Sequence, residues 1–230
     1  MTTLASLFTC PSFAGARRAL MLAGCFWLAV GGTDAVRAQT APTAPTAQTG
    51  TVAADTFIQE LSTDVLNTVK ADKAIQGGDV AKVMALVDSK VMPHVNFQRM
   101  TASAVGRYWR TATPEQQQRL QAEFKTLLVR TYSGALAQVK DQAIALKPLR
   151  SNTADNEVVV RTEIKGKGEP IQLDYRLERT ATGWKVYDFN VLGIWLVEQY
   201  RSSFAQEIST GGIDGLIAKL AERNKTASKG

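Results

Sequence analysis

The chain has 230 residues, with 27 Lys and Arg against 21 Asp and Glu, a net charge of +6 and an ordinary apolar content of 45%. It contains one histidine and two cysteines, which are too few for the common zinc and iron–sulfur sites. A serine triad would have to use His94, the single imidazole. The composition therefore argues against most metal and nucleophilic catalysis, and the charge is well short of that of a nucleic-acid-binding tail.

The first 38 residues have the pattern of a secretory signal peptide. Arg17 and Arg18 precede an apolar run over residues 19–30, and small residues then lead to Ala38. The run is shorter than the roughly 20 apolar residues of a permanent transmembrane helix. Cleavage near Ala38 would remove both cysteines, Cys10 and Cys25.

A lipoprotein signal is the alternative for this segment. The residues Leu22-Ala23-Gly24-Cys25 match a lipobox, in which the cysteine is lipidated and becomes the new N-terminus. However, the apolar run continues past Cys25 to Val30, whereas a lipoprotein usually turns polar there. We favour ordinary cleavage, and both interpretations predict export to the periplasm of a bacterium.

The composition after the signal peptide predicts one folded domain. Residues 39–54 are mostly Thr, Ala, Pro and Gln without charge, which predicts a disordered linker. The folded domain is expected over residues 55–223 and a disordered polar tail over residues 224–230.

The first half of this domain has helical periodicity. A helix is expected to begin at Asp55, a second at Asp79 after the break at Gly77 and Gly78, and a short third between Pro93 and Gly106. The clearest start signal is Thr113-Pro114-Glu115-Gln116, with Thr as N-cap, Pro in the first turn and Gln three residues after the cap.

The second half has the two-residue periodicity of strands. Strands are predicted over residues 142–149, 157–164, 171–178 and 184–191, and the short turns between them imply antiparallel pairing. A helix is expected near residues 194–208, followed by a break at residues 211–212 and a last helix. The order predicts an α+β fold: a curved antiparallel sheet of four, possibly five, strands packed by about six to seven helices.

The polar residues offer little for catalysis. His94 follows Pro93 in a connection between helices and is expected at the surface. Asp174 and Glu178 alternate with Arg176 on one strand face, which indicates a solvated face rather than a catalytic pair. Phosphate-binding loops, nucleophile elbows and metal-ligand spacings do not occur in the sequence. The residues favour binding over catalysis.

Aromatic and aliphatic residues are the main signal in the folded domain. Composition and spacing leave open whether they fill the core or line a cavity between sheet and helices. From the predicted apolar faces we select one set of candidate ligand-binding residues: Phe124, Leu127, Leu128, Tyr132, Leu146, Val160, Ile164, Leu173, Tyr175, Val186, Trp195 and Leu196.

The sequence resembles the MlaC family of bacterial periplasmic phospholipid-binding proteins, also called toluene-tolerance proteins. The resemblance covers about residues 57–220. It rests on segments in the family's order: Val91-Met92-Pro93-His94-Val95-Asn96-Phe97, Gly106-Arg107-Tyr108-Trp109, Thr113-Pro114-Glu115-Gln116, residues 124–132, Trp184-Lys185-Val186-Tyr187-Asp188 and Tyr200-Arg201-Ser202-Ser203-Phe204. Two positions depart from the family pattern. Asn96 stands where Asp is usual, and Trp195 stands where a small Ser is common and could narrow or reshape the cavity.

The resemblance implies a carrier of glycerophospholipid without a cofactor, the phospholipid being its cargo. Such a carrier exchanges lipid between an outer-membrane lipoprotein–porin complex and an inner-membrane ABC transporter with an MCE-domain subunit, and so maintains the lipid asymmetry of the outer membrane. It holds the acyl tails in an apolar cavity and leaves the headgroup near solvent.

Two other functions remain open at this point. One is an exported chaperone or protein-binding module with an apolar groove. The other is an enzyme of the cone-shaped α+β type that resembles nuclear transport factor two, which would need a carboxyl group inside its cavity. Asp188 is the candidate for that carboxyl group, although a bond to a turn or an arginine explains it more simply.

Overall fold

A computed structural model describes residues 52–149 and 155–226 of the chain. The predicted signal peptide, residues 39–51 of the predicted linker and residues 227–230 lie outside the described residues. Among the helices that are described, none is both long and apolar enough to cross a membrane.

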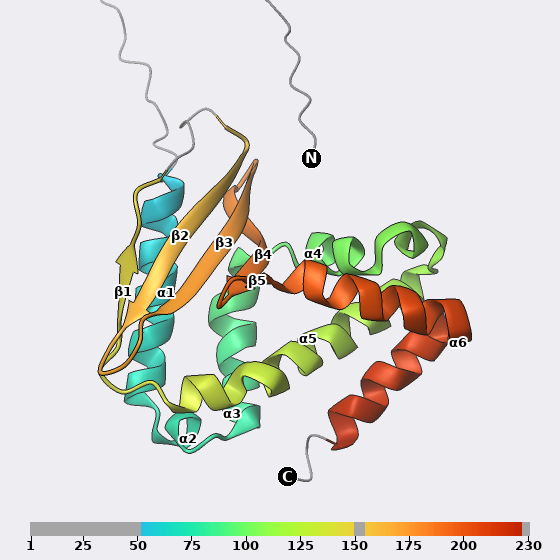
Figure 1. Ribbon diagram of the computed structural model, residues 1–230, viewed down its shortest axis with the longest axis horizontal. Coiled ribbons are helices and arrows are strands. Elements are labelled where there is room, and N and C mark those ends of the chain that lie inside the picture. Colours follow the sequence, from blue (N-terminus) through green and yellow to red (C-terminus); the bar gives the residue numbers. More distant parts are fainter. Residues whose placement is uncertain (1–51, 150–154, 227–230) are drawn as a thin grey trace, which may run out of the picture. The chain divides into compact units, whose positions relative to one another are not determined.

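The described residues form an α+β fold in which helices precede and follow a single sheet (Figure 1). The helices are α1 (Ala54–Ala71), α2 (Lys73–Gln76), α3 (Val80–Leu86), the π-helical turn η1 (Val87–Val91), the 3-10 turns η2 (Met92–His94) and η3 (Gly106–Thr111), α4 (Phe97–Val105), α5 (Pro114–Ala137) and α6 (Leu196–Thr226). The strands are β1 (Ala143–Leu146), β2 (Glu157–Lys165), β3 (Ile171–Thr180), β4 (Gly183–Val191) and β5 (Ile194–Trp195).

The sheet has five strands in the order β1-β2-β3-β4-β5, and every neighbouring pair is antiparallel. The α+β class and the antiparallel sheet are therefore confirmed. The fifth strand is short. Ile194 and Trp195, predicted as the start of a helix, instead pair with Val191 and Asn190 before α6 begins.

Local capping explains where the helices begin. At α5 the predicted capping box is confirmed: the Thr113 hydroxyl accepts the N–H of Gln116, and the Gln116 side chain accepts the N–H of Thr113. Asp79 caps α3 as expected. Asp55 does not cap α1, because that helix already begins at Ala54 and Asp55 lies within its first turn.

A bulge in β4 changes which of its residues face the helices. The register between β3 and β4 shifts after Arg176, so that Leu177 lies opposite Val186 whereas Tyr175 lies opposite Phe189. The extra residue is Tyr187. Simple alternation would place Asp188 on the same face as Val186, but the bulge moves Phe189 to that face instead.

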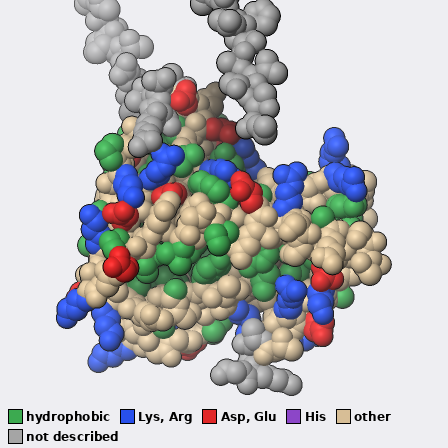
Figure 2. All heavy atoms as spheres, in the orientation of Figure 1, with side chains coloured by type: hydrophobic (Ala, Val, Ile, Leu, Met, Phe, Trp, Pro, Cys, Tyr) green, Lys and Arg blue, Asp and Glu red, His purple; other side chains and the backbone are tan. Residues whose placement is uncertain are grey.

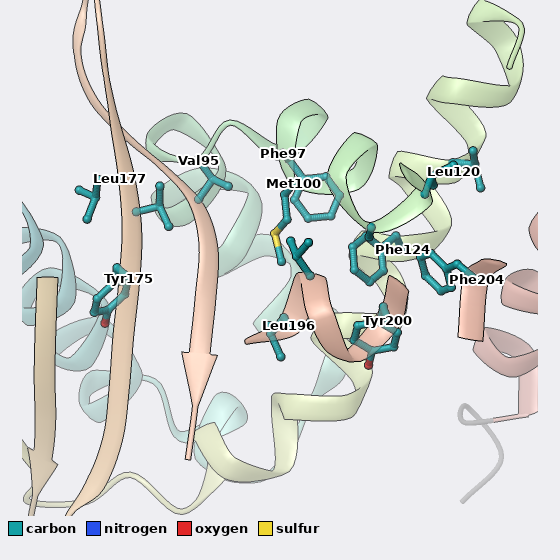
Figure 3. Packing of buried hydrophobic residues seen from close by; sticks show 14 of the residues in the cluster. Val95, Phe97, Met100, Leu120, Phe124, Tyr175, Leu177, Leu196, Tyr200 and Phe204 are labelled. Carbon is teal, nitrogen blue, oxygen red and sulfur yellow. The ribbon is translucent and has the colours of Figure 1, made fainter. Parts of the chain in front are cut away.

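Two clusters of buried apolar residues make up the core. The larger joins the sheet to α4, α5 and α6, and its aromatic centre is Phe124, which packs edge-on against Tyr200 at 5.0 Å and Phe204 at 5.2 Å between ring centroids (Figure 3). The smaller cluster lies among α1, α2, α3 and α5, and includes Leu66, Val83 and Val129.

The C-terminal helix extends beyond the expected end of the domain. As expected, the helical path is interrupted at Gly212, whose φ of 68° is outside the helical range. The helix then continues to Thr226 rather than ending near residue 223. Asn224 is buried, and its amide donates to the carboxylate of Glu123 at 2.7 Å, so the beginning of the predicted tail is packed on α5.

Candidate functional site: an apolar cavity between two core clusters

A cavity of about 460 Å³ lies where the two core clusters do not meet. On the view of Figure 2, hydrophobic side chains gather across the middle of the surface, over the strand ends and α5. The lining residues come from α1, α3, η1, η2, α4, α5, the loop after α5, the sheet and the start of α6: Leu66, Val83, Val87, Val91, Met92, Val95, Phe97, Met100, Lys125, Leu128, Val129, Tyr132, Ala135, Leu136, Gln138, Val139, Gln142, Ile164, Ile171, Leu173, Phe189, Val191 and Leu196. The interior is therefore hollow rather than filled.

Helix α5 forms one long wall of this cavity. Its lining positions begin at Lys125, and the wall continues past its C-terminal end to Val139. At 1.5 Å per residue this wall is about 21 Å long. One leaflet of a bilayer has an apolar depth of about 15 Å, half of the roughly 30 Å hydrocarbon core. The cavity is therefore long enough for an extended acyl chain.

Few polar groups face the cavity. Among the described residues that line it, Lys125 alone is charged, and the Lys125 ammonium is 2.6 Å from a carboxylate oxygen of Asp88 in η1. The other polar lining residues are Tyr132, Gln138 and Gln142. Burial raises the pKa of the Tyr132 hydroxyl, which therefore stays neutral at physiological pH. The cavity walls are therefore mostly apolar and contain few side chains that could take part in catalysis.

Part of the predicted lipid-binding set lies in the cavity wall. The structure brings together Leu128 and Tyr132 from α5, Ile164 and Leu173 from the sheet, and Leu196 from α6. The wall formed by α3 and η1, including Val83, Val87 and Val91, is not in the predicted set. Their helical spacing predicts that these apolar side chains face the interior. Nothing local in the sequence, however, distinguishes a residue that faces a cavity from one that faces the packed core.

Four other residues of the set belong to the packed core instead. Phe124 is the centre of the aromatic cluster, and Val160 and Val186 are buried between the sheet and the helices. Tyr175 is also buried, and its hydroxyl is 3.1 Å from that of Ser62 on α1. Burial raises the pKa of Tyr175 to about 12, so this pair is a neutral hydrogen bond that attaches the sheet to α1.

The three remaining residues of the set lie outside the cavity lining. Leu127 and Leu146 are half-buried and pack against the larger core cluster. Trp195 lies opposite Asn190 in the sheet, and the guanidinium of Arg176 lies over its ring at 3.9 Å from the ring centroid. Trp195 is therefore not among the residues that line the cavity.

The carboxylates considered for catalysis have structural partners. Asp174 is buried rather than solvated, contrary to expectation, and it accepts the backbone N–H of Thr162 at 3.2 Å. Glu178 forms an ion pair with Arg99. His94, expected at the surface, is half-buried and its ring packs edge-on against Phe57.

Asp188, the candidate for an enzymatic role, does not line the cavity. Its carboxylate accepts the N–H groups of Phe189 and Val197 and pairs with Arg176 at 3.0 Å. Burial raises its pKa above the ordinary value, and the two N–H groups and Arg176 oppose this shift. Among the described residues, no group of three or more His, Cys, Asp or Glu side chains could hold a metal ion.

Comparison with known proteins agrees with this geometry. The family model described as MlaC protein matches residues 59–222. The chain belongs to the MlaC family. The match spans α1 to α6 and therefore includes every element that lines the cavity.

Curated and solved relatives extend the comparison beyond the family model. The toluene tolerance protein ttg2D of Pseudomonas putida is 28% identical over 187 residues, covering 77% of this chain and 87% of the relative. The intermembrane phospholipid transport system binding protein MlaC of Haemophilus influenzae is 23% identical over 170 residues, covering 72% of this chain and 79% of the relative. A solved structure of a phospholipid-binding protein from Ralstonia solanacearum, in complex with a phospholipid, is 48% identical with a TM-score of 0.75 and covers 76% of this MlaC-family chain and 99% of its own.

Proposed function

We propose that this protein is a periplasmic carrier that binds glycerophospholipid by its acyl tails and shuttles it between the outer and inner membranes. The observation that carries this proposal is the apolar cavity of about 460 Å³ between the sheet and α5. The relative from Ralstonia solanacearum, with the same fold and 48% identity, was solved in complex with a phospholipid.

The physical chemistry of the cargo explains the character of the cavity. Two acyl chains contain roughly 30 methylene groups at about 0.8 kcal/mol each, so their exposure to water would cost about 24 kcal/mol. Apolar walls replace the bilayer interior at little net cost, and they need no catalytic groups. The lipid-binding residues that we propose for this cavity include Leu128, Tyr132, Ile164, Leu173 and Leu196.

A carrier of this kind lowers the barrier to transfer but gives it no direction. Energy for direction has to come from a partner. We propose an inner-membrane ABC transporter with an MCE-domain subunit as one partner and an outer-membrane lipoprotein–porin complex as the other. Export would use residues 1–38 as a cleavable signal peptide, and maintained lipid asymmetry of the outer membrane would be the outcome.

The test is the lipid content of the protein purified from a bacterial periplasm. We expect native mass spectrometry and lipid extraction to find co-purifying glycerophospholipid, because the cavity keeps acyl tails from water. A protein with an empty cavity after mild purification would contradict the proposal. A bound peptide in place of lipid would support the alternative of an exported chaperone.

A further inference from the structure

Three exposed aliphatic side chains lie at one corner of the sheet. In the described part of the chain the exposed large hydrophobic residues are Val52, Ile171, Leu192 and Ile194. Ile171 begins β3, Leu192 lies in the turn after β4, and Ile194 begins β5. The N–H of Leu192 donates to the carbonyl of Gln172 at 3.0 Å, which holds the turn against β3. We call Ile171, Leu192 and Ile194 the corner patch.

The corner patch is continuous with the cavity wall. Ile171 itself lines the cavity. Ile194 lies opposite Val191, and Val191 lies opposite Leu173. Residues directly opposite each other in a sheet point to the same face, and both Val191 and Leu173 line the cavity. A row of aliphatic side chains therefore leads from the surface into the cavity.

The turn that carries Leu192 has an unfavourable backbone for this residue. Leu192 has a φ of 53° and Gly193 a φ of 88°. Turns with positive φ at both central residues favour Asn, Asp and Gly, and a leucine is strained there. The Leu192 side chain is 67% exposed, so burial within this chain does not compensate for the strain. The Asn190 side chain accepts the N–H of Gly193 at 2.8 Å and fixes the turn. The turn thus holds an exposed leucine in a strained conformation, and strain of this kind is often found at functional positions.

Two lysines flank the corner patch. Ile164 lies opposite Ile171, so the connection from β2 to β3, with Lys165 and Lys167, is next to the patch. Their side chains are 58% and 91% exposed. Each forms a long ion pair, Lys165 with Glu163 at 3.8 Å and Lys167 with Asp141 at 3.9 Å, and such pairs between exposed side chains are weak enough to exchange for other anionic partners. Both ammonium groups are therefore placed to meet anionic groups beside the apolar side chains; Glu169, in the same connection, is the remaining acidic residue there.

We propose that the corner patch enters the surface of a phospholipid bilayer, so that acyl tails move between bilayer and cavity along the aliphatic row. This inference rests on the proposed function and names the surface through which the cargo passes. Aliphatic side chains inserted at the headgroup boundary, with lysines at the level of the lipid phosphates, are the combination that binds bilayers. A protein partner on the same surface is the competing outcome of the test.

The test measures lipid uptake from vesicles that contain no protein. The vesicles contain phosphatidylcholine, phosphatidylglycerol and a phospholipid with a fluorescent tail, and the delipidated full chain extracts the label. The test variant combines Leu192→Asn with Ile194→Ser, because Asn tolerates a left-handed φ and preserves the turn. The matched control is Val52→Ser, which removes an exposed aliphatic side chain near Trp184 at the opposite end of β4.

We expect the extraction rate of the double variant to fall at least fivefold, while Val52→Ser extracts at the rate of the unmodified protein. Tm and the amount of phospholipid bound at saturation should be the same in all three proteins. An unchanged extraction rate in the double variant would overturn the inference, and so would a slower rate seen only when a protein partner is added. Failure of the unmodified protein to extract label from these vesicles, although it co-purifies with phospholipid, would overturn the inference alone. A protein that holds no phospholipid in either experiment would overturn the proposed function, and the inference with it.

Discussion

Asn96 connects two interactions that an aspartate could not make together. Its side-chain oxygen accepts the N–H of Arg99 and caps α4, and its amide nitrogen donates to a Glu178 carboxylate oxygen at 2.6 Å. Arg99 pairs with Glu178 and Glu157, and its guanidinium lies 3.6 Å from the centroid of the Tyr187 ring. The hydrogen bond from Arg99 lowers the pKa of Glu157. These contacts attach α4 to the sheet.

We therefore expect Asn96→Asp to destabilise the protein by about 1–3 kcal/mol, because it places two carboxylates in contact. The measurement is the free energy of unfolding in urea at pH 7. The double variant Asn96→Asp with Glu178→Gln restores a donor opposite the new carboxylate and should recover part of the loss. Strictly additive effects of the two substitutions in a double-mutant cycle would show that the residues do not interact.

At the scale of elements, Asp188 joins β4 to the beginning of α6. Val197 is in the first turn of that helix, where N–H groups have no partner within the helix. Asp188 lies on the neighbouring strand β4, and its carboxylate accepts the N–H of Val197 in a hydrogen bond of 3.1 Å. Leu196, the preceding residue, lines the cavity. The buried carboxylate thus holds the helix end that supplies part of the cavity wall.

Removal of this carboxylate should loosen the start of α6. We expect Asp188→Ala to lower the free energy of unfolding by about 2–4 kcal/mol, because it leaves two backbone N–H groups without their acceptor and removes the buried partner of Arg176. Amide hydrogen exchange at Val197 should become faster. The matched control is Glu198→Ala, which removes the exposed partner of Arg176 and should cost less than about 1 kcal/mol. Equal effects of the two substitutions would contradict the assigned role of Asp188.

Periodicity and capping predicted most of the helices and strands, but not which side chains of β4 face the helices. Thr113 and Gln116 are three residues apart, and their capping box is a local interaction that the sequence pattern identifies. The bulge at Tyr187 appears only in the pairing of β4 with the preceding strand β3, and the alternation of residues within β4 does not reveal it. Because of the bulge, Phe189 and Val191 line the cavity and Asp188 does not. The cavity therefore lacks the carboxyl group that the alternative enzymatic function would need from Asp188.

At the scale of the whole described chain, the cavity follows from two core clusters that remain apart. Apolar spacing identifies core-facing residues such as Val83 and Val129, which are buried, and Leu128, which is half-buried. It does not report the distance between the layers that these residues face. Phe124 and Val160 have the same sequence character as Leu128, yet they fill the core whereas Leu128 lines the cavity. This is why the predicted fold is confirmed, while only part of the predicted set lies in the wall.

A charged substitution should have different effects at a residue that lines the cavity and at a residue that fills the core. Leu128→Asp puts a carboxylate in the cavity wall, where a half-buried side chain can still reach water, so the fold should survive. Bound phospholipid should fall at least tenfold, because acyl tails would have to cover a charge that apolar surroundings do not solvate. Val160→Asp puts the same charge into the packed core and should prevent folding altogether.

The control for both is Ala122→Asp, an exposed position of α5 outside the cavity lining, which should change neither lipid content nor folding. Lipid content is measured by native mass spectrometry and folding by circular dichroism and thermal unfolding. Normal lipid content in a folded Leu128→Asp protein would remove this residue from the binding site. A folded Val160→Asp protein would contradict the assignment of this residue to the packed core.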